Sequence, residues 1–113
     1  MRRYTELVER LRSSVLQGEG KTDPGLRQAV AARSAELGGG PAAPPGAAIP
    51  AGLRDLVEKT ALHAYQITDE EVEALRRAGH SEDEIFEVAV SAAVGGGLAR
   101  LERGLAALEG ARR

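Results

Sequence analysis

The sequence predicts an all-α domain of five or six helices that ends in a long apolar helix. Three observations indicate this fold class. Apolar residues recur at helical spacing in several segments, Ser/Thr-x-x-Glu capping signals precede the later segments, and the one long break is rich in glycine and proline. Because 113 residues can bury about two thirds of the surface of the unfolded chain, we expect one domain.

Two helices are expected before the Gly/Pro-rich break. In the first, over residues 2 to 17, the apolar positions share one helical face: Tyr4, Leu7, Val8, Leu11 and Val15. Gly18 ends this helix. A second helix runs to about Leu37, with Thr22 or Asp23 as its cap and Pro24 in its first turn. Together they form an N-terminal helical hairpin, residues 1 to 37.

Residues 38 to 50, GGGPAAPPGAAIP, are expected to be a loop or linker. Four glycines and four prolines in thirteen residues do not sustain a regular element. The break separates the hairpin from a helical core at residues 51 to 113. Because both parts are too short to be independent domains, we expect the hairpin to pack on the core.

The core is expected to begin with a helix over residues 51 to 66. Its apolar face is formed by Leu53, Leu56, Val57, Thr60, Ala61 and Ala64. Leu62 falls instead on the polar side of this helix, where an apolar residue hints at a subunit contact.

Two repeated capping signals mark the starts of the next helices, Thr68-x-x-Glu71 and Ser81-x-x-Glu84. In each pair the hydroxyl can accept from the N–H three residues on, and the glutamate can return to the N–H of the capping residue. Acidic residues fill both first turns, where the helix dipole favours negative charge, and Gly79 ends the shorter helix.

The last helix, residues 82 to about 109, is apolar on nearly all sides over 85 to 99. Such a helix is expected at the centre of the fold, surrounded by other helices or by subunits. Three glycines at 95 to 97 would each weaken an isolated helix by roughly 1 kcal/mol, so they indicate a close backbone approach or a kink. Its isolated polar groups, Glu87 and Ser91, either bind each other or face a cavity.

The composition excludes several kinds of chemistry. The chain has no cysteine, and therefore no disulfide, thiolate nucleophile or iron–sulfur cluster. The two histidines, His63 and His80, lie seventeen positions apart with no ligand partner at helical spacing, so we expect neither a metal nor a cofactor.

Charge and hydropathy exclude two classes of partner. Fifteen basic and seventeen acidic residues are interspersed and give a net charge of −2, which does not suit binding to nucleic acid. The longest apolar run is shorter than the roughly 20 residues that cross a bilayer, so no membrane partner is expected. The charged N-terminus lacks the apolar core of a signal peptide, which favours a cytoplasmic location.

The candidate catalytic residues are Glu58, His63 and Tyr65. They lie on a helix whose remaining surface is largely apolar, an environment in which these groups can perform acid–base chemistry. On an ideal helix Tyr65 is about 20° from Glu58, whereas His63 is about 140° away and needs a bend or a neighbour to reach it. An ordinary ion pair of Glu58 with Arg54 is the alternative. His80, in a turn, is expected to be either a solvated or a helix-end residue.

Three features occur together in residues 56 to 108: LVEKTAL entering one helix, a short helix ending in AGHSEDEIFE, and a long Ala/Gly-rich helix. In this combination the run resembles the carboxymuconolactone decarboxylase and alkylhydroperoxidase-D-like superfamily. The resemblance implies an all-helical fold and a homo-oligomer, often a trimer or hexamer, with the long helices in the interface.

Redox-active members of that superfamily carry a glutamate, a Cys-x-x-Cys and a histidine. The resemblance matches Glu58 to the glutamate. Counting forward from Glu58 places the two cysteine positions on Glu70 and Glu73, whereas counting back from Gly79 places them on Ala64 and Ile67. Since the chain has no cysteine in any register, the thiol peroxidase mechanism is excluded. The non-thiol acid–base chemistry of the decarboxylase members stays open.

Two functions follow as hypotheses. The first is a cysteine-less member of this superfamily that binds a small molecule, or decarboxylates or isomerises it, with Glu58, His63 and Tyr65 around a pocket. The alternative is a non-catalytic assembly protein whose long apolar helix, with Leu62, builds a homo-oligomer. A closed pocket that joins Glu58 to His63 or Tyr65 would favour the first, whereas a solvent-exposed Glu58–Arg54 pair without a cavity would exclude it.

Overall fold

The computed structural model describes residues 2–44 and 48–111, and the regular elements of this part of the chain are all helices. Its elements are α1 (Arg2–Gln17), α2 (Pro24–Leu37), α3 (Ala51–Leu62), the short 3-10 helix η1 (Ala64–Gln66), α4 (Asp69–Arg77) and α5 (Glu82–Ala111). The described helices confirm the all-α class. Of the expected loop at 38 to 50, residues 45 to 47 lie outside the described residues.

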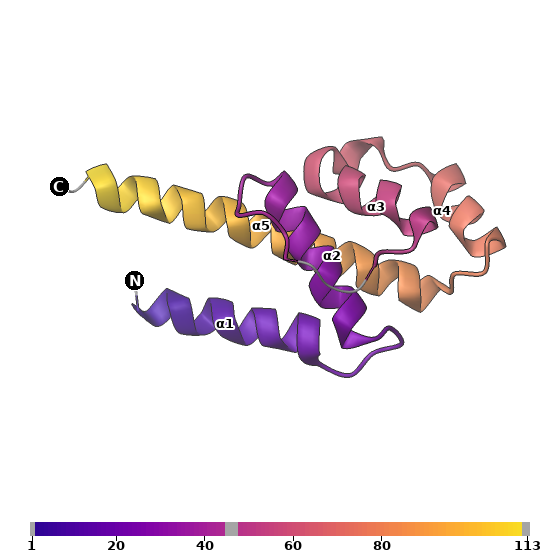
Figure 1. Cartoon of the computed structure of the whole chain (residues 1–113), viewed down its shortest axis with the longest axis horizontal. Helices are drawn as coiled ribbons and strands as arrows, with labels where there is room; N and C mark the ends of the chain where they lie inside the picture. The colour runs from indigo at the N-terminus through magenta and orange to yellow at the C-terminus, as the bar shows by residue number, and fades with distance from the viewer. Residues whose placement is uncertain (1, 45–47, 112–113) are drawn as a thin grey trace.

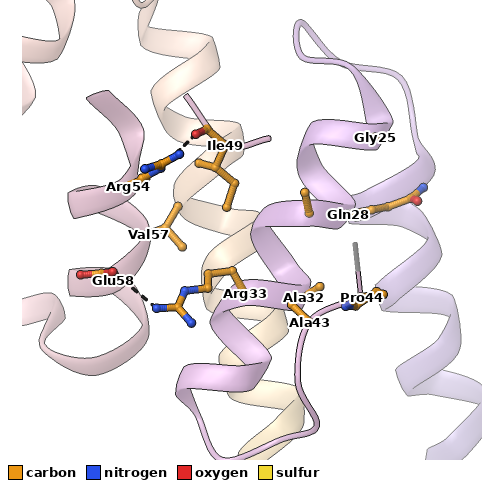
Figure 2. Close-up of a pocket in the computed structure, with 11 residues that line it drawn as sticks. Gly25, Gln28, Ala32, Arg33, Ala43, Pro44, Ile49, Arg54, Val57 and Glu58 are labelled. Atoms are coloured by element: carbon orange, nitrogen blue, oxygen red, sulfur yellow. Dashed lines mark hydrogen bonds and ion pairs between the residues drawn. The ribbon is translucent and has the colours of Figure 1, made fainter. Parts of the chain in front are cut away.

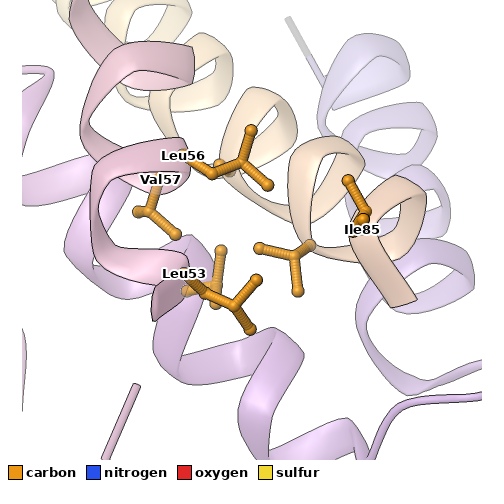
Figure 3. Close-up of a cluster of buried hydrophobic side chains, with 7 residues drawn as sticks. Leu53, Leu56, Val57 and Ile85 are labelled. Atoms are coloured by element: carbon orange, nitrogen blue, oxygen red, sulfur yellow. The ribbon is translucent and has the colours of Figure 1, made fainter. Parts of the chain in front are cut away.

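The long helix α5 is the axis of the fold, and α1, α2, α3 and α4 all contact it. Figure 1 shows α2 crossing α5 near its middle and α3 and α4 lying beside its first half. The core lies between α2, α3 and the first half of α5, and Figure 3 shows this cluster: Val30, Leu53, Leu56, Val57, Ile85, Val88 and Ala92. One face of α5, with Phe86, Ala93 and Gly97, stays exposed because its neighbours cover only the other side.

The glycine run of α5 marks a close approach of two backbones. A Cβ atom on Gly95 would lie 2.2 Å from the Ala31 carbonyl oxygen of α2, and one on Gly96 would lie 2.9 Å from Ser34 Oγ. Ser34 is fully buried and donates to the Ala92 carbonyl at 2.5 Å. Gly95 and Gly96 therefore let α2 pack directly on the α5 backbone, while nothing lies within 4 Å of a Cβ on Gly97.

The first core helix is shorter than expected: α3 ends at Leu62 and not at residue 66. His63 has φ −148° and ψ 57°, outside the helical region, and η1 follows it. The early end has a physical reason, because the turn lets Ile67 pack against the core cluster, whereas residues 64 to 66 bury nothing. The residues after 62 therefore do not continue the face of α3.

Of the two hydrogen bonds expected in each capping box, only the one accepted by the Thr or Ser hydroxyl is formed. Thr68 and Ser81 accept from the backbone N–H groups of Glu71 and Glu84, at 3.2 and 3.1 Å. The reciprocal bonds of a full capping box are replaced, because the two glutamate side chains bind other groups. Glu71 pairs with Lys59 Nζ at 2.6 Å, and Glu84 with His80 Nδ1 at 2.5 Å. The Glu71–Lys59 pair ties α4 to α3, and the Glu84–His80 contact joins the first turn of α5 to the turn before it.

We predict that Gly95→Ala lowers the free energy of unfolding by about 1–3 kcal/mol, because its methyl group would overlap the Ala31 carbonyl unless α2 and α5 moved apart. Gly97→Ala is the matched control. With open space around it, the same substitution should raise the free energy of unfolding by about 0.5–1 kcal/mol. Urea unfolding followed by circular dichroism measures both, and equal effects would contradict the close approach.

Candidate functional site

A pocket of about 650 Å³ lies between α2, α3 and the loop that joins them. Figure 2 shows its lining: Gly25, Gln28, Ala29, Ala32 and Arg33 of α2, Ala43, Pro44 and Ile49 of the loop, and Arg54, Val57 and Glu58 of α3. The volume falls in the range of small-molecule sites, roughly 300–1,000 Å³. The lining is mainly apolar, with charged side chains at a few points, as is common in such sites.

The charged groups of the pocket come from facing helices. Arg54 and Glu58 lie four residues apart on α3 and so share one face, and Arg33 faces them from α2. Glu58 pairs with Arg33 at 3.6 Å, and Arg33 also pairs with Glu36 at 2.5 Å. The ion pair that the sequence suggested for Glu58 is therefore formed across helices with Arg33, because Arg54 turns to the loop and donates to the Ile49 carbonyl at 3.2 Å.

The three residues singled out in the sequence do not meet in one chain. Glu58 lines the pocket with its side chain 51% exposed. His63 and Tyr65 are exposed and do not line it; their rings touch each other edge to face, with centroids 5.9 Å apart. The early end of α3 at Leu62 separates the two groups. An acid–base constellation of Glu58 with His63 or Tyr65 is therefore absent from the described single chain.

Of the two alternatives for His80, the structure places it at a helix end, just before α5, and not in solvent. Its ring is about four-fifths buried and contacts the Glu84 carboxylate through Nδ1 at 2.5 Å. A Cβ atom on Gly52 would lie 3.4 Å from His80 Nε2, so the ring packs against the start of α3. Gly79 before it has φ +103°, in the left-handed region that favours glycine. His80 thus links the α4–α5 turn to α3 and takes a structural place.

One of the two sequence hypotheses was that Glu87 binds Ser91. In the structure Glu87 binds the α1–α2 turn instead. Its carboxylate accepts from the N–H groups of Lys21 and Thr22 at 2.7 and 2.9 Å, and from Thr22 Oγ1 at 2.6 Å. Arg27 holds the same turn through the Val15 and Gly18 carbonyls at 2.7 and 2.6 Å. A carboxylate that stands alone on an apolar helix needs hydrogen-bond partners when it is buried. The isolated position of Glu87 was therefore the feature of the sequence that could have predicted these contacts.

The pKa of Glu87 reflects two opposing causes. Burial raises the pKa of this carboxyl, but the hydrogen bonds from the Thr22 hydroxyl and from the Lys21 and Thr22 amides, with the charge of Arg27, outweigh burial. The net result is a pKa below the ordinary glutamate value. The Glu87 carboxylate accepts three hydrogen bonds from the α1–α2 turn. It therefore holds this turn in place and is not available as a free base.

Within residues 2–44 and 48–111, no group of three or more His, Asp or Glu side chains is placed to hold a metal ion. The described helices also include none with the length and hydropathy of a membrane span. Comparison with family models, with curated proteins and with solved structures finds no match. The resemblance to the decarboxylase superfamily is accordingly a likeness of the motifs in residues 56 to 108 alone.

We predict that Glu87→Gln lowers stability by roughly 1–2 kcal/mol at neutral pH, where the ionised carboxylate is hydrogen-bonded. Because the folded pKa lies below the unfolded one, this stabilisation is present above the ordinary glutamate pKa and is lost as the pH falls through the lowered pKa. The variant should therefore show a flatter loss of stability in acid, measured by urea unfolding over a pH series.

Glu19→Gln is the control for this experiment, because Glu19 is an exposed carboxylate of the same turn. Its acid profile should match that of the unmodified chain. If the stability of Glu87→Gln and of the unmodified chain fell in parallel with decreasing pH, the role of the ionised Glu87 in holding the turn would be refuted.

Proposed function

We propose that this protein is a non-catalytic assembly protein that forms a homo-oligomer through one end of its long helix. The observation that carries the proposal is where the exposed apolar side chains lie. Among the described residues, six of the eight exposed large apolar side chains belong to α1 or α5: Tyr4, Leu7, Leu11, Phe86, Leu101 and Leu108. A concentration of this kind on two adjacent helices is typical of an interaction surface.

Five of these six residues lie in what we term the arm, residues 4–11 of α1 and 101–111 of α5. Figure 1 shows the two helices side by side and antiparallel at one end of the molecule, and an Arg12–Glu102 ion pair at 3.0 Å joins them. From Leu101 to Ala111 every residue is exposed except Leu105, which is half-buried. Because this end of α5 buries little apolar surface, it is only marginally stable in water, and a further partner surface would stabilise it.

The apolar residues of the arm form continuous stripes. On α1 they are spaced three and four apart at Tyr4, Leu7 and Leu11, and on α5 they are spaced four and three apart at 101, 105 and 108. This is the spacing of the seam that buries one helix against another in a coiled coil or a four-helix bundle. The arm therefore presents two helices ready for bundle packing.

A second copy of the chain fits this surface. Two arms related by a two-fold axis would complete a four-helix bundle with the apolar stripes inside. The arm carries charges of both signs, with Glu6 and Arg10 on α1 and Glu102 and Arg103 on α5. Mixed charges allow pairing with an identical surface, whereas nucleic acid or an acidic membrane would require a positive one.

A second candidate function is small-molecule binding at the α2–α3 pocket, as a cysteine-less relative of the decarboxylase superfamily. It is favoured by the position of Glu58 in the lining of a pocket of about 650 Å³. Decarboxylation or isomerisation has less support, because His63 and Tyr65 lie away from that pocket. We therefore propose binding, and not turnover, for this site.

We predict that Leu7→Glu and Leu108→Glu each shift the protein from an oligomer toward the 11.9 kDa monomer, because each places a charge within the apolar stripe. Both side chains are about half exposed in the single chain, so the helical fold should persist. Sedimentation velocity at micromolar concentration measures the change, with circular dichroism to confirm the fold.

Leu62→Glu is the matched control. Leu62 on α3, which the sequence offered as a subunit contact, is 45% exposed, close to the 44% of Leu108, but lies outside the arm and is not part of the interface proposed here. It should leave the oligomer intact. The proposal fails if the unmodified chain sediments as a monomer, or if Leu62→Glu dissociates the oligomer while the two arm variants do not.

A further inference from the structure

We infer that the α2–α3 pocket takes a small molecule with a single carboxylate on an apolar body. The inference names the ligand class for the second candidate function and rests on it, but it is independent of assembly through the arm. It is carried by the side chains of the pocket: one arginine without a carboxylate partner, an arginine already neutralised, and apolar walls.

Arg54 is the group that would hold the carboxylate. Its Nε donates to the Ile49 carbonyl at 3.2 Å, which fixes the guanidinium at the edge of the pocket. Its two Nη groups have no hydrogen-bond or ion-pair partner among the described residues. The planar edge formed by the two Nη groups matches the two oxygens of a carboxylate, which it can bind through two parallel charged hydrogen bonds.

The charges around the pocket set the charge of the ligand. Arg33 is paired with Glu36 at 2.5 Å and with Glu58 at 3.6 Å, so its positive charge is already compensated. Arg54 is the one arginine of the described lining without a carboxylate partner, whereas Arg33 with Glu36 and Glu58 carries one excess negative charge, which repels additional negative charge. A monoanion therefore fits, whereas a phosphate dianion would bring one charge too many.

The rest of the lining is apolar and therefore favours a ligand whose remaining part is apolar. Ala29 and Ala32 of α2 face Val57 of α3, and Ile49 and Pro44 close the loop side. The short alanine side chains leave the space that a ring or a branched chain would fill.

The loop that forms one wall is held at two points. The Ala43 amide donates to Glu36 Oε2 at 2.6 Å, and the Ile49 carbonyl accepts from Arg54. Because both ties join the loop to pocket-bearing helices, the described walls are formed before a ligand arrives, which lowers the entropic cost of binding.

The test is a titration of the full ¹⁵N-labelled chain with phenylacetate and hexanoate, followed by backbone amide shifts. We expect saturable shifts confined to Ala43 and to residues 25–33 and 49–58, weaker at higher salt. Phenylacetamide, which has the same shape without the charge, should bind at least about tenfold more weakly. Phenyl phosphate should bind no more tightly than phenylacetate, because Glu58 opposes its second charge.

Three variants locate the interaction. Arg54→Gln should weaken phenylacetate at least about tenfold, and Arg54→Lys, which keeps the charge but not the planar fork, should lie between it and the unmodified chain. Arg77→Gln, at an exposed arginine of α4, is the control and should leave affinity unchanged. Unchanged shift dispersion of each variant confirms that it is folded.

The inference is overturned if neither carboxylate gives saturable shifts at millimolar concentration, if phenylacetamide binds equally well, or if Arg54→Gln keeps its affinity. Tighter binding of phenyl phosphate would equally overturn the single-charge assignment. Sedimentation of the same samples separates the two proposals. If the ligands do not bind but the oligomer is intact, the proposal for the pocket fails and the proposal for the arm stands.

Discussion

At Gly95 the backbone of α5 approaches α2 so closely that a methyl group would lie 2.2 Å from the Ala31 carbonyl oxygen. Beside this point the buried Ser34 hydroxyl donates to the Ala92 carbonyl, a bond that replaces water for a polar group in the core. The contact fixes the position of α2 on α5. Both the pocket and the arm depend on it, since α2 forms one wall of the pocket and leads directly from α1.

The path from this contact to the arm runs through the α1–α2 turn. Glu87 of α5 and the buried Arg27 of α2 together bind backbone groups of this turn. Two charged side chains that each bind two or more groups of a turn define its geometry more sharply than apolar packing does. They aim α1 back along the second half of α5, where Arg12 meets Glu102. The arm is therefore a consequence of polar contacts at the opposite end of α1.

Local sequence patterns predicted the elements that local physics determines. The extents of α1 and α2 follow from their helical spacing, the Asp23 cap and the Pro24 start, and Thr68 and Ser81 cap as expected. The end of α3 was not predictable from the helical spacing of its apolar residues. The helix ends where it does because Ile67 packs on core residues that are distant in sequence.

The candidate site was only partly predictable for the same reason. Glu58 could be chosen because a carboxylate stood beside an apolar face, but its partner Arg33 lies 25 residues earlier on a weakly amphipathic helix. No pattern links the two before α2 and α3 pack together. The side chains of Glu71 and Glu84 likewise bind Lys59 and His80 and not the N–H groups of their capping residues, since other polar side chains compete with a local N–H.

The central claim is that a second copy covers the arm, and amide hydrogen exchange of the unmodified chain at several concentrations tests it directly. In an isolated chain the amides of residues 101–111 belong to an uncovered helix end and should exchange rapidly, whereas those of 85–99 lie over the core. We expect 101–111 to be protected at high concentration and to lose that protection on dilution, while 85–99 stay protected throughout. Rapid exchange of 101–111 at every concentration would contradict the claim.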